Sequence, residues 1–175
     1  MATERWKMAE VNAWDREAFV AHLGFLFEHS PWIVAAAWAN RPFGRREDLH
    51  RALTAVVERA GEERQLALIR AHPDLVGRAA LAGTLTREST GEQRAAGLDP
   101  GRLTPEEVGR FGAQNEAYKS RFGFPFVICA RENTKDTILA GFAARLGNSQ
   151  EHEIAIALAE IAKICWYRLA DVVDE

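Results

Sequence analysis

Hydrophobic side chains recur through most of the chain at the three- and four-residue spacing of α-helices. The first such stripe consists of Phe19, Leu23, Leu26 and Phe27. It follows Asp15, a residue type that commonly caps helices. Ser30 and Pro31 then form a second helix start and open the segment PWIVAAAWAN, which is apolar on nearly every side. A helix of that kind is expected to be buried.

Further stripes predict helices over about 47–60, through 66–69, from Ser89 onward, and over 104–121, 134–147 and 149–172. The helix through 66–69 must end near His72, because Pro73 pushes the residue before it out of helical backbone angles. The stretch TPEE from Thr104 is a strong helix start, with a hydroxyl cap, a proline at the first position and a glutamate at the third.

One stretch, FGFPFVICA at residues 122–130, lacks any helical period. Glycine and proline interrupt an aromatic and β-branched run, and nothing else in the chain offers a strand to pair with it. We therefore expect an extended, buried connector. The fold class predicted for the chain is all-α, a single-domain bundle of about eight helices over residues 1–175.

Composition narrows the function classes. A chain of 175 residues fits one domain and can bury a substantial core without disulfides. The net charge is −3, and the charges are spread along the chain, so neither nucleic acid nor a membrane surface is an expected partner. The two cysteines form no CxxC pair, and no secretory signal or membrane-spanning run is visible. We expect a soluble, cytoplasmic protein.

His72 is the first candidate for chemistry. A histidine at the end of a helix can have a purely structural role, in which its imidazole complements the helix dipole and the last carbonyl groups. It can equally act as a general acid or base, because histidine titrates near neutral pH without assistance. No histidine, aspartate or glutamate has the spacing of known metal ligands, so no metal is expected.

The stretch Ser89-x-x-Glu92 also supports two interpretations. As a capping box, its two side chains would simply satisfy backbone amides at a helix start. The same helix start, followed by Glu92 and Gln93, would also offer free N–H groups, a carboxylate and an amide to a small polar anion.

Arg168 is unusual because it lies on the apolar stripe of the last helix, within about 40° of Ile154, Ile161 and Ile164. A buried arginine needs an anionic partner, which could be an internal carboxylate or the carboxylate of a ligand. Arg145, near the end of the preceding helix, is expected to cap that helix. The residues alone leave three classes open: a cofactor-free lyase or isomerase, a helical ligand-binding module, and a helical interaction protein.

Five motifs in the same order resemble those of the 2-oxo-4-hydroxy-4-carboxy-5-ureidoimidazoline (OHCU) decarboxylase family. They are W-x-x-R-P-F from Trp38, A-H-P-D-L from Ala71, L-T-x-E-S-x-x-E-Q-x-x-A-G-L from Leu85, N-x-x-Y-x-x-R-F-G-F-P-F-V-I-C-A from Asn115, and R-L-x-N with E-I-x-K-I-x-x-x-R-L in the last two helices. The resemblance covers nearly the whole chain; residues 1–10 lie outside it.

The resemblance implies a fold, an activity and a site. It implies an all-α, usually homodimeric enzyme without metal or cofactor, which completes urate degradation by decarboxylating OHCU to (S)-allantoin. His72 would be the proton donor and Glu92 its acidic partner. The ligand site would be lined by Pro73, Ser89, Gln93, Arg168 and the backbone of Phe126, Val127, Ile128, Cys129 and Ala130. The alternative is a helical module that binds ureide- or purine-like anions without turnover.

Overall fold

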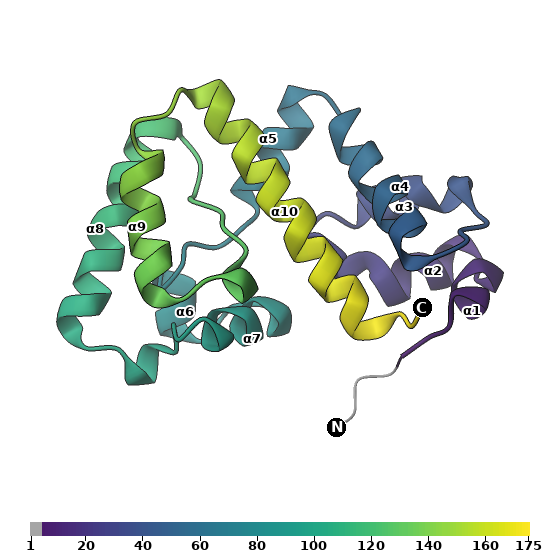
Figure 1. Cartoon of the computed structure of the whole chain (residues 1–175), viewed down its shortest axis with the longest axis horizontal. Coiled ribbons are helices and arrows are strands. Elements are labelled where there is room, and N and C mark those ends of the chain that lie inside the picture. The colour runs from purple at the N-terminus through teal and green to yellow at the C-terminus, as the bar shows by residue number, and fades with distance from the viewer. Residues whose placement is uncertain (1–4) are drawn as a thin grey trace. The chain divides into compact units, whose positions relative to one another are not determined.

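The computed structural model describes residues 5–175, and over that range the backbone is helical (Figure 1). It contains ten α-helices and four short 3₁₀ segments within the described residues. The only extended pairing recorded there is a single bridge between Trp6 and Val173. The prediction of an all-α fold is therefore confirmed. Within the same range no helix is both long enough and apolar enough to cross a membrane.

The chain clusters into two compact units. One unit comprises the residues up to Ala71 together with Ala162–Glu175, and the other comprises His72–Ile161. The prediction of a single domain over residues 1–175 stays a prediction. The first unit holds α1 (Met8–Ala13), α2 (Arg16–Leu23), α3 (Pro31–Ala37), α4 (Arg46–Glu58), α5 (Glu62–Arg70) and the C-terminal part of α10 (Gln150–Val172).

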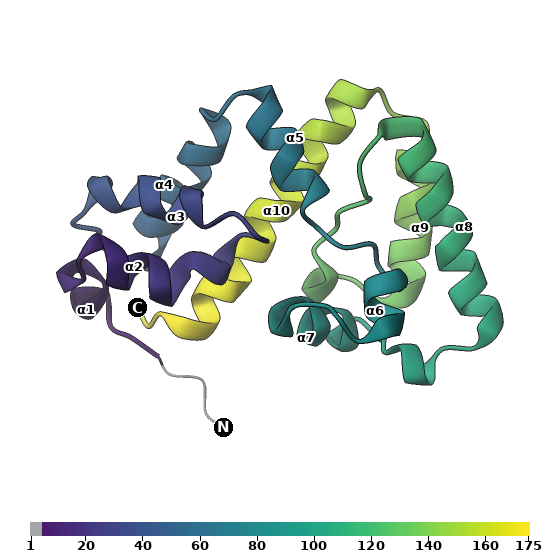
Figure 2. The same cartoon turned by 180° about the vertical axis from the view of Figure 1, so that it is seen from behind.

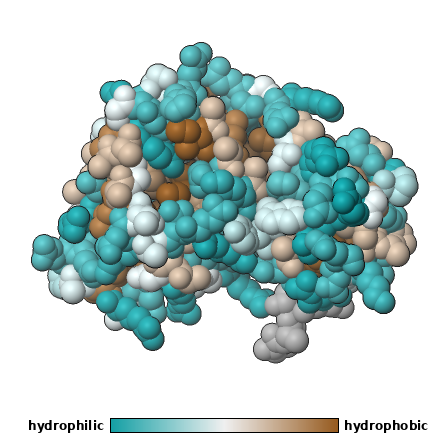
Figure 3. All heavy atoms as spheres, in the orientation of Figure 1, coloured by the Kyte–Doolittle hydropathy of each residue, from teal (hydrophilic) through white to brown (hydrophobic). Residues whose placement is uncertain are grey.

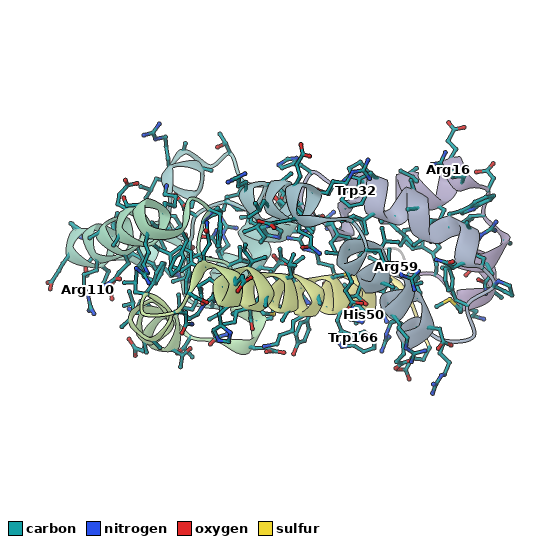
Figure 4. The ribbon with its side chains drawn as sticks, turned by 90° about the horizontal axis from the view of Figure 1, so that it is seen from above. Arg16, Trp32, His50, Arg59, Arg110 and Trp166 are labelled. Atoms are coloured by element: carbon teal, nitrogen blue, oxygen red, sulfur yellow. The ribbon has the colours of Figure 1, made fainter. Side chains whose placement is uncertain are left out.

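Asp15 caps α2 as expected, since its Oδ1 accepts a hydrogen bond of 2.8 Å from the backbone N–H of Ala18. Helix α3 packs against both α2 and α4 and buries Ile33, Val34 and Ala37. Pro31 and Ala36 are exposed, so the helix is buried on one side only. The aromatic ring of Trp166 in α10 lies edge-on to the ring of His50 in α4, with centroids 5.4 Å apart (Figure 4). The Nε2 atom of that histidine lies 2.7 Å from the carbonyl oxygen of Ala162. These contacts hold the C-terminal part of α10 in the first unit.

The W-x-x-R-P-F motif serves this packing. The indole N–H of Trp38 donates to the Trp14 carbonyl at 3.2 Å. Nη1 of Arg41 donates to the carbonyls of Asn12 and Trp14, both at 2.8 Å, and its guanidinium lies 4.0 Å from the centroid of the Trp38 ring. The motif therefore ties the loop after α1 to the loop after α3.

The second unit holds α6 (Arg78–Ala82), α7 (Arg87–Ala95), α8 (Pro105–Phe122), α9 (Lys135–Arg145) and the N-terminal part of α10. The capping box at Thr104 is present, with Glu107 as its reciprocal partner. Ser149 accepts a hydrogen bond from the N–H of His152 at the start of α10. Between α8 and the 3₁₀ segment η4 (Ala130–Glu132) the chain runs without helical turns, as predicted (Figure 2).

Two details of the prediction are wrong. Helix α7 begins at Arg87, with Thr86 as its N-cap, and the Thr86 hydroxyl accepts a hydrogen bond of 3.2 Å from the N–H of Ser89. Ser89 therefore lies inside the first turn, and Ser89-x-x-Glu92 is not a capping box, because a threonine three residues earlier takes the capping position. The helices α1 and α6 were not predicted, since six and five residues are too few to show a periodic stripe.

Candidate active site

His72 lies directly beyond α5, where Pro73 prevents the helix from continuing. Its side chain is 8% exposed. An ordinary C-terminal histidine that only complements a helix dipole would be expected to remain in water. Burial of this residue at the start of an irregular segment therefore favours a role in a site over a purely local one.

The segment that follows His72 is anchored at three successive residues. Lys119 donates to Asp74 Oδ2 at 2.7 Å, Asn115 Nδ2 donates to the Leu75 carbonyl at 2.9 Å, and the N–H of Val76 donates to Gln93 Oε1 at 3.0 Å. The hydrogen bond to Asp74 raises the pKa of Lys119, so the ammonium group of Lys119 stays charged at neutral pH. The segment from Asp74 to Val76 is thus tied to α8 by two contacts and to α7 by one.

Val76 has a left-handed backbone, with φ at +51°. A β-branched residue in that region costs on the order of 1–3 kcal/mol, because its side chain crowds its own backbone. The hydrogen bond to Gln93 Oε1 helps to hold the residue there. A strained residue four positions after His72 indicates that the shape of this loop matters to the site.

The buried residues of α7 are polar. Ser89, Glu92 and Gln93 are 5%, 8% and 4% exposed, respectively. Their spacing of three and four residues places them on one face of the helix. Charged and polar groups are seldom buried unless they are paired or serve a ligand. Glu92 is not part of a capping box, so capping does not explain why its carboxylate is buried, and the burial favours a role in the site.

The extended connector approaches the same helix, since α7 packs against η4, which starts at Ala130. From Phe124 to Ala130 every residue is buried except Ile128, which is partly exposed. Burial raises the pKa of Cys129 to about 11, so its thiol stays protonated at neutral pH. The structure therefore brings together, within one unit, the predicted site segments of the His72 loop, α7 and the connector.

Arg168 belongs to the other unit. It is 2% exposed, and its Nη1 lies 3.0 Å from the Phe25 carbonyl oxygen and 3.1 Å from Glu28 Oε2. Of the two partners considered for this arginine, the internal carboxylate is present. A guanidinium carries five N–H donors, so one ion pair is compatible with a second partner. Its assignment to ligand binding stays a prediction.

Arg145 was expected to cap α9, and this is wrong. Its Nε donates to Glu153 Oε1 at 2.8 Å and its Nη1 donates to the Val127 carbonyl at 2.7 Å. The same carboxylate, which is fully buried, also accepts from Tyr118 Oη at 2.5 Å and Asn148 Nδ2 at 2.9 Å. A signal existed for this network, because Glu153 lies about 40° from buried Ala157 on the helical wheel of α10.

Two cavities adjoin these segments. A surface groove of about 910 Å³ lies along the residues from Asp74 to Ala82 and α8, and none of the predicted site residues lines it. Gln93 lines a smaller cavity of about 150 Å³ together with residues of α6 and α7 and of the segments that follow these helices. Over the described residues, no three histidine, cysteine, aspartate or glutamate side chains gather in a geometry that could hold a metal ion. Figure 3 shows that some hydrophobic residues reach this face of the molecule among hydrophilic ones.

A helical fold that buries histidine, glutamate, serine and glutamine side chains beside an extended backbone has the equipment of an acid–base enzyme acting on a small polar substrate. The family model described as OHCU decarboxylase matches residues 12–170. The chain belongs to the OHCU decarboxylase family.

Relatives support this assignment over nearly full length. The 2-oxo-4-hydroxy-4-carboxy-5-ureidoimidazoline decarboxylase of Amia calva is 42% identical over 167 residues, which cover 95% of this chain and 94% of the relative. The protein with the same description from Haloferax volcanii is 38% identical over 94% of both chains. The uric acid degradation bifunctional protein PucL of Bacillus subtilis is 40% identical over 96% of this chain, which spans 33% of that protein.

Solved structures have the same fold. A crystal structure of (S)-allantoin synthase superposes with a TM-score of 0.75 at 27% identity, and covers 95% of this chain and 54% of that one. A crystal structure of OHCU decarboxylase in the presence of (S)-allantoin gives a TM-score of 0.66 at 21% identity, over 90% of this chain and 96% of that one. At that identity the second match supports the fold alone.

Proposed function

We propose that this chain converts OHCU to (S)-allantoin and CO₂, the last step of urate degradation to allantoin, as a carboxy-lyase without a cofactor. One observation carries the proposal most strongly: the family match runs over residues 12–170, and within one unit the segments that bear His72, Ser89, Glu92 and Gln93 bury these side chains. A helical binding module would need no such concentration of titratable groups.

The chemistry requires little equipment. The substrate carries a carboxylate and a hydroxyl group on one ring carbon, beside a carbon in a C=N bond. Loss of CO₂ pushes an electron pair into that conjugated system, so the substrate serves as its own electron sink. The protein must hold the carboxylate out of conjugation, stabilise the developing negative charge, and deliver one proton to one face.

The buried side chains suit these tasks. His72 delivers the proton, and Glu92 orients its imidazole. Ser89 and Gln93 bind polar groups of the substrate from the same face of α7, and Pro73 lines the site beside His72. The peptide groups of residues 126–130 bind the ring and the ureido group. The resemblance also implies that Arg168 binds the anionic or ureido part of the substrate, and this role stays a prediction.

Partners and location follow from the same resemblance. We propose a homodimer that works in the cytoplasm, with OHCU as the small-molecule partner. Sedimentation equilibrium checks the oligomeric state: a mass near twice 19.5 kDa supports the proposal, and a mass of one chain contradicts it.

The deciding experiment supplies freshly generated OHCU to the purified protein and follows optically active allantoin by circular dichroism. Spontaneous decay yields racemic allantoin, so a chiral product is the signature of catalysis. We expect rapid formation of the (S) enantiomer, and a chelator should leave the rate unchanged. Binding of allantoin without turnover would support the binding module instead.

The proton-donor role is tested by His72→Asn. We expect a fall in kcat of about 10²–10⁴-fold, the usual contribution of general acid–base catalysis. His152→Asn is the matched control, because His152 is exposed on α10 and should be replaceable without effect. A His72→Asn rate within a few-fold of wild type would leave the enzyme assignment standing and remove the proton-donor role.

A further inference from the structure

We infer that Arg145 and Glu160 are positioning residues, which clamp the connector so that the peptide groups of Ile128 face the substrate. Both act on backbone atoms of the neighbouring residues: Arg145 Nη1 binds the carbonyl of Val127 and Glu160 Oε2 binds the N–H of Cys129. The inference rests on the proposed function, because it assumes that this connector binds OHCU.

Backbone geometry supplies the first step. In an extended chain, the N–H and C=O groups of successive residues point alternately to opposite edges. Val127 and Cys129 are two residues apart, so the groups that Arg145 and Glu160 hold lie on one edge. The hydrogen bonds are 2.7 and 2.8 Å long, so the backbone groups on that edge are bonded to side chains of the protein and are not offered to a ligand. The N–H and C=O of Ile128 therefore point to the other edge.

Exposure supplies the second step. Ile128 is the one residue between Phe124 and Ala130 that is partly exposed. The adjoining segment η4 packs against α7, which bears the buried Ser89, Glu92 and Gln93. Ile128 lies two residues before the segment that contacts α7, so its peptide groups lie near that helix.

The clamp is rigid because Arg145 is itself fixed. Its guanidinium lies 4.2 Å from the centroid of the Phe126 ring, and that ring stacks on Phe142 with centroids 3.9 Å apart. Its counter-ion Glu153 is held in turn by Tyr118 and Asn148. Peptide groups aimed by such a network cost little reorganisation when a substrate binds.

Glu160 offers the cleaner test, because it is only half-buried and its replacement should leave the fold intact. Glu160→Ala removes the acceptor for the Cys129 N–H, whereas Glu160→Gln keeps an oxygen that can accept it. We expect Glu160→Ala to raise KM for OHCU about tenfold, with a smaller change in kcat, since one hydrogen bond is being lost from substrate positioning. Glu160→Gln should stay within about threefold of wild type.

Two further variants complete the design. Arg145→Lys keeps a cation beside Glu153 and loses the planar fork that also reaches Val127, so KM should rise by a similar factor. Glu151→Ala, at an exposed carboxylate on the same helix, is the control and should change nothing. Thermal unfolding of each variant establishes that it is folded.

The outcomes separate the two proposals. A wild-type protein that does not turn over OHCU refutes the proposed function and this inference with it. An active wild type with a folded Glu160→Ala variant whose KM lies within twofold refutes the inference alone. Failure of Glu160→Gln to restore KM also refutes it, because the loss would then not depend on an acceptor for the Cys129 N–H.

Discussion

Each compact unit buries one arginine against one glutamate, and the two ion pairs have different consequences. The pairs are Arg145–Glu153 and Arg168–Glu28. In both, the arginine also donates to the backbone carbonyl of a residue outside the α-helices, Val127 in one unit and Phe25 in the other. The same device fixes a loop in each unit, but only Val127 belongs to a predicted site segment.

A second device is also repeated. Each unit has a non-glycine residue with a left-handed backbone: His29 with φ at +47° and Val76 with φ at +51°. Histidine tolerates this region better than a β-branched residue does, and His29 is exposed. Val76 is buried and strained, beside the site. The backbone strain at Val76 therefore lowers the stability of the His72–Ile161 unit more than the strain at His29 lowers that of the other unit, and in return it fixes the shape of the loop beside the site.

The largest expected effect comes from Glu153→Leu. It strips the partner from Arg145, Tyr118 and Asn148 together and leaves a buried guanidinium without its counter-ion. Breaking a buried pair from one side costs about 3–5 kcal/mol in the free energy of unfolding. Urea denaturation measures it, with the exposed Glu151→Leu as the control. A loss below about 1 kcal/mol would mean that the pair is not the central support we describe.

A smaller loss is expected from Glu28→Gln in the other unit. Glutamine keeps an acceptor for Arg168 and removes the charge, which costs about 1.5–3 kcal/mol. Because glutamine still accepts a hydrogen bond from Arg168 and so holds the guanidinium in place, kcat/KM at a temperature where the variant is folded should stay within about threefold. A tenfold rise in KM would contradict this expectation, since it would show that Arg168 needs the charge of Glu28, and not only an acceptor, to serve the substrate.

Tyr118→Phe should cost about 1–2 kcal/mol at neutral pH, because it deletes one hydrogen bond to a charged group and leaves Arg145 and Asn148 on Glu153. Burial, followed by the bond to Glu153, raises the pKa of Tyr118 well above its ordinary value of 10.0.

The sign of the alkaline effect follows from that shift. A pKa raised by folding contributes stability that is complete below pH 10 and is lost as pH rises further, because the unfolded tyrosine ionises first. The wild type should therefore lose its advantage over Tyr118→Phe above about pH 10. Urea denaturation at pH 7 and pH 10.5 measures this. An advantage that stays constant between the two pH values would contradict the burial of this hydroxyl.

Local sequence signals explain what could be predicted. The helix starts at Asp15 and Thr104 were identified because a cap bonds to residues two or three positions away. The end of α5 near His72 followed from Pro73 alone. At Thr86 and Ser89 two hydroxyl residues competed for one helix start, and spacing could not decide between them.

Tertiary partners could not be predicted, for a physical reason. The apolar stripe of α10 marked Arg168 as a residue in need of an anion, and the pattern could not choose between Glu28 and a ligand. The network around Glu153 was missed because its members come from three helices and the loop between α9 and α10. Of the site, His72, Ser89 and Glu92 stood out in the sequence, whereas the clamp on the connector did not.

The smallest effect concerns the strained residue. Replacing Val76 by glycine and by alanine removes the same buried side chain apart from one methyl group, but only glycine is relaxed at φ +51°. Elsewhere alanine is the more stable of the two; here Val76→Gly should exceed Val76→Ala by about 1 kcal/mol in unfolding free energy. The same pair of variants at Glu151, which is exposed inside α10, is the control, and alanine should be the more stable substitution there. If Val76→Ala were instead the more stable of the two variants, the loop at residue 76 would relax without cost. The two units would then not differ in backbone strain.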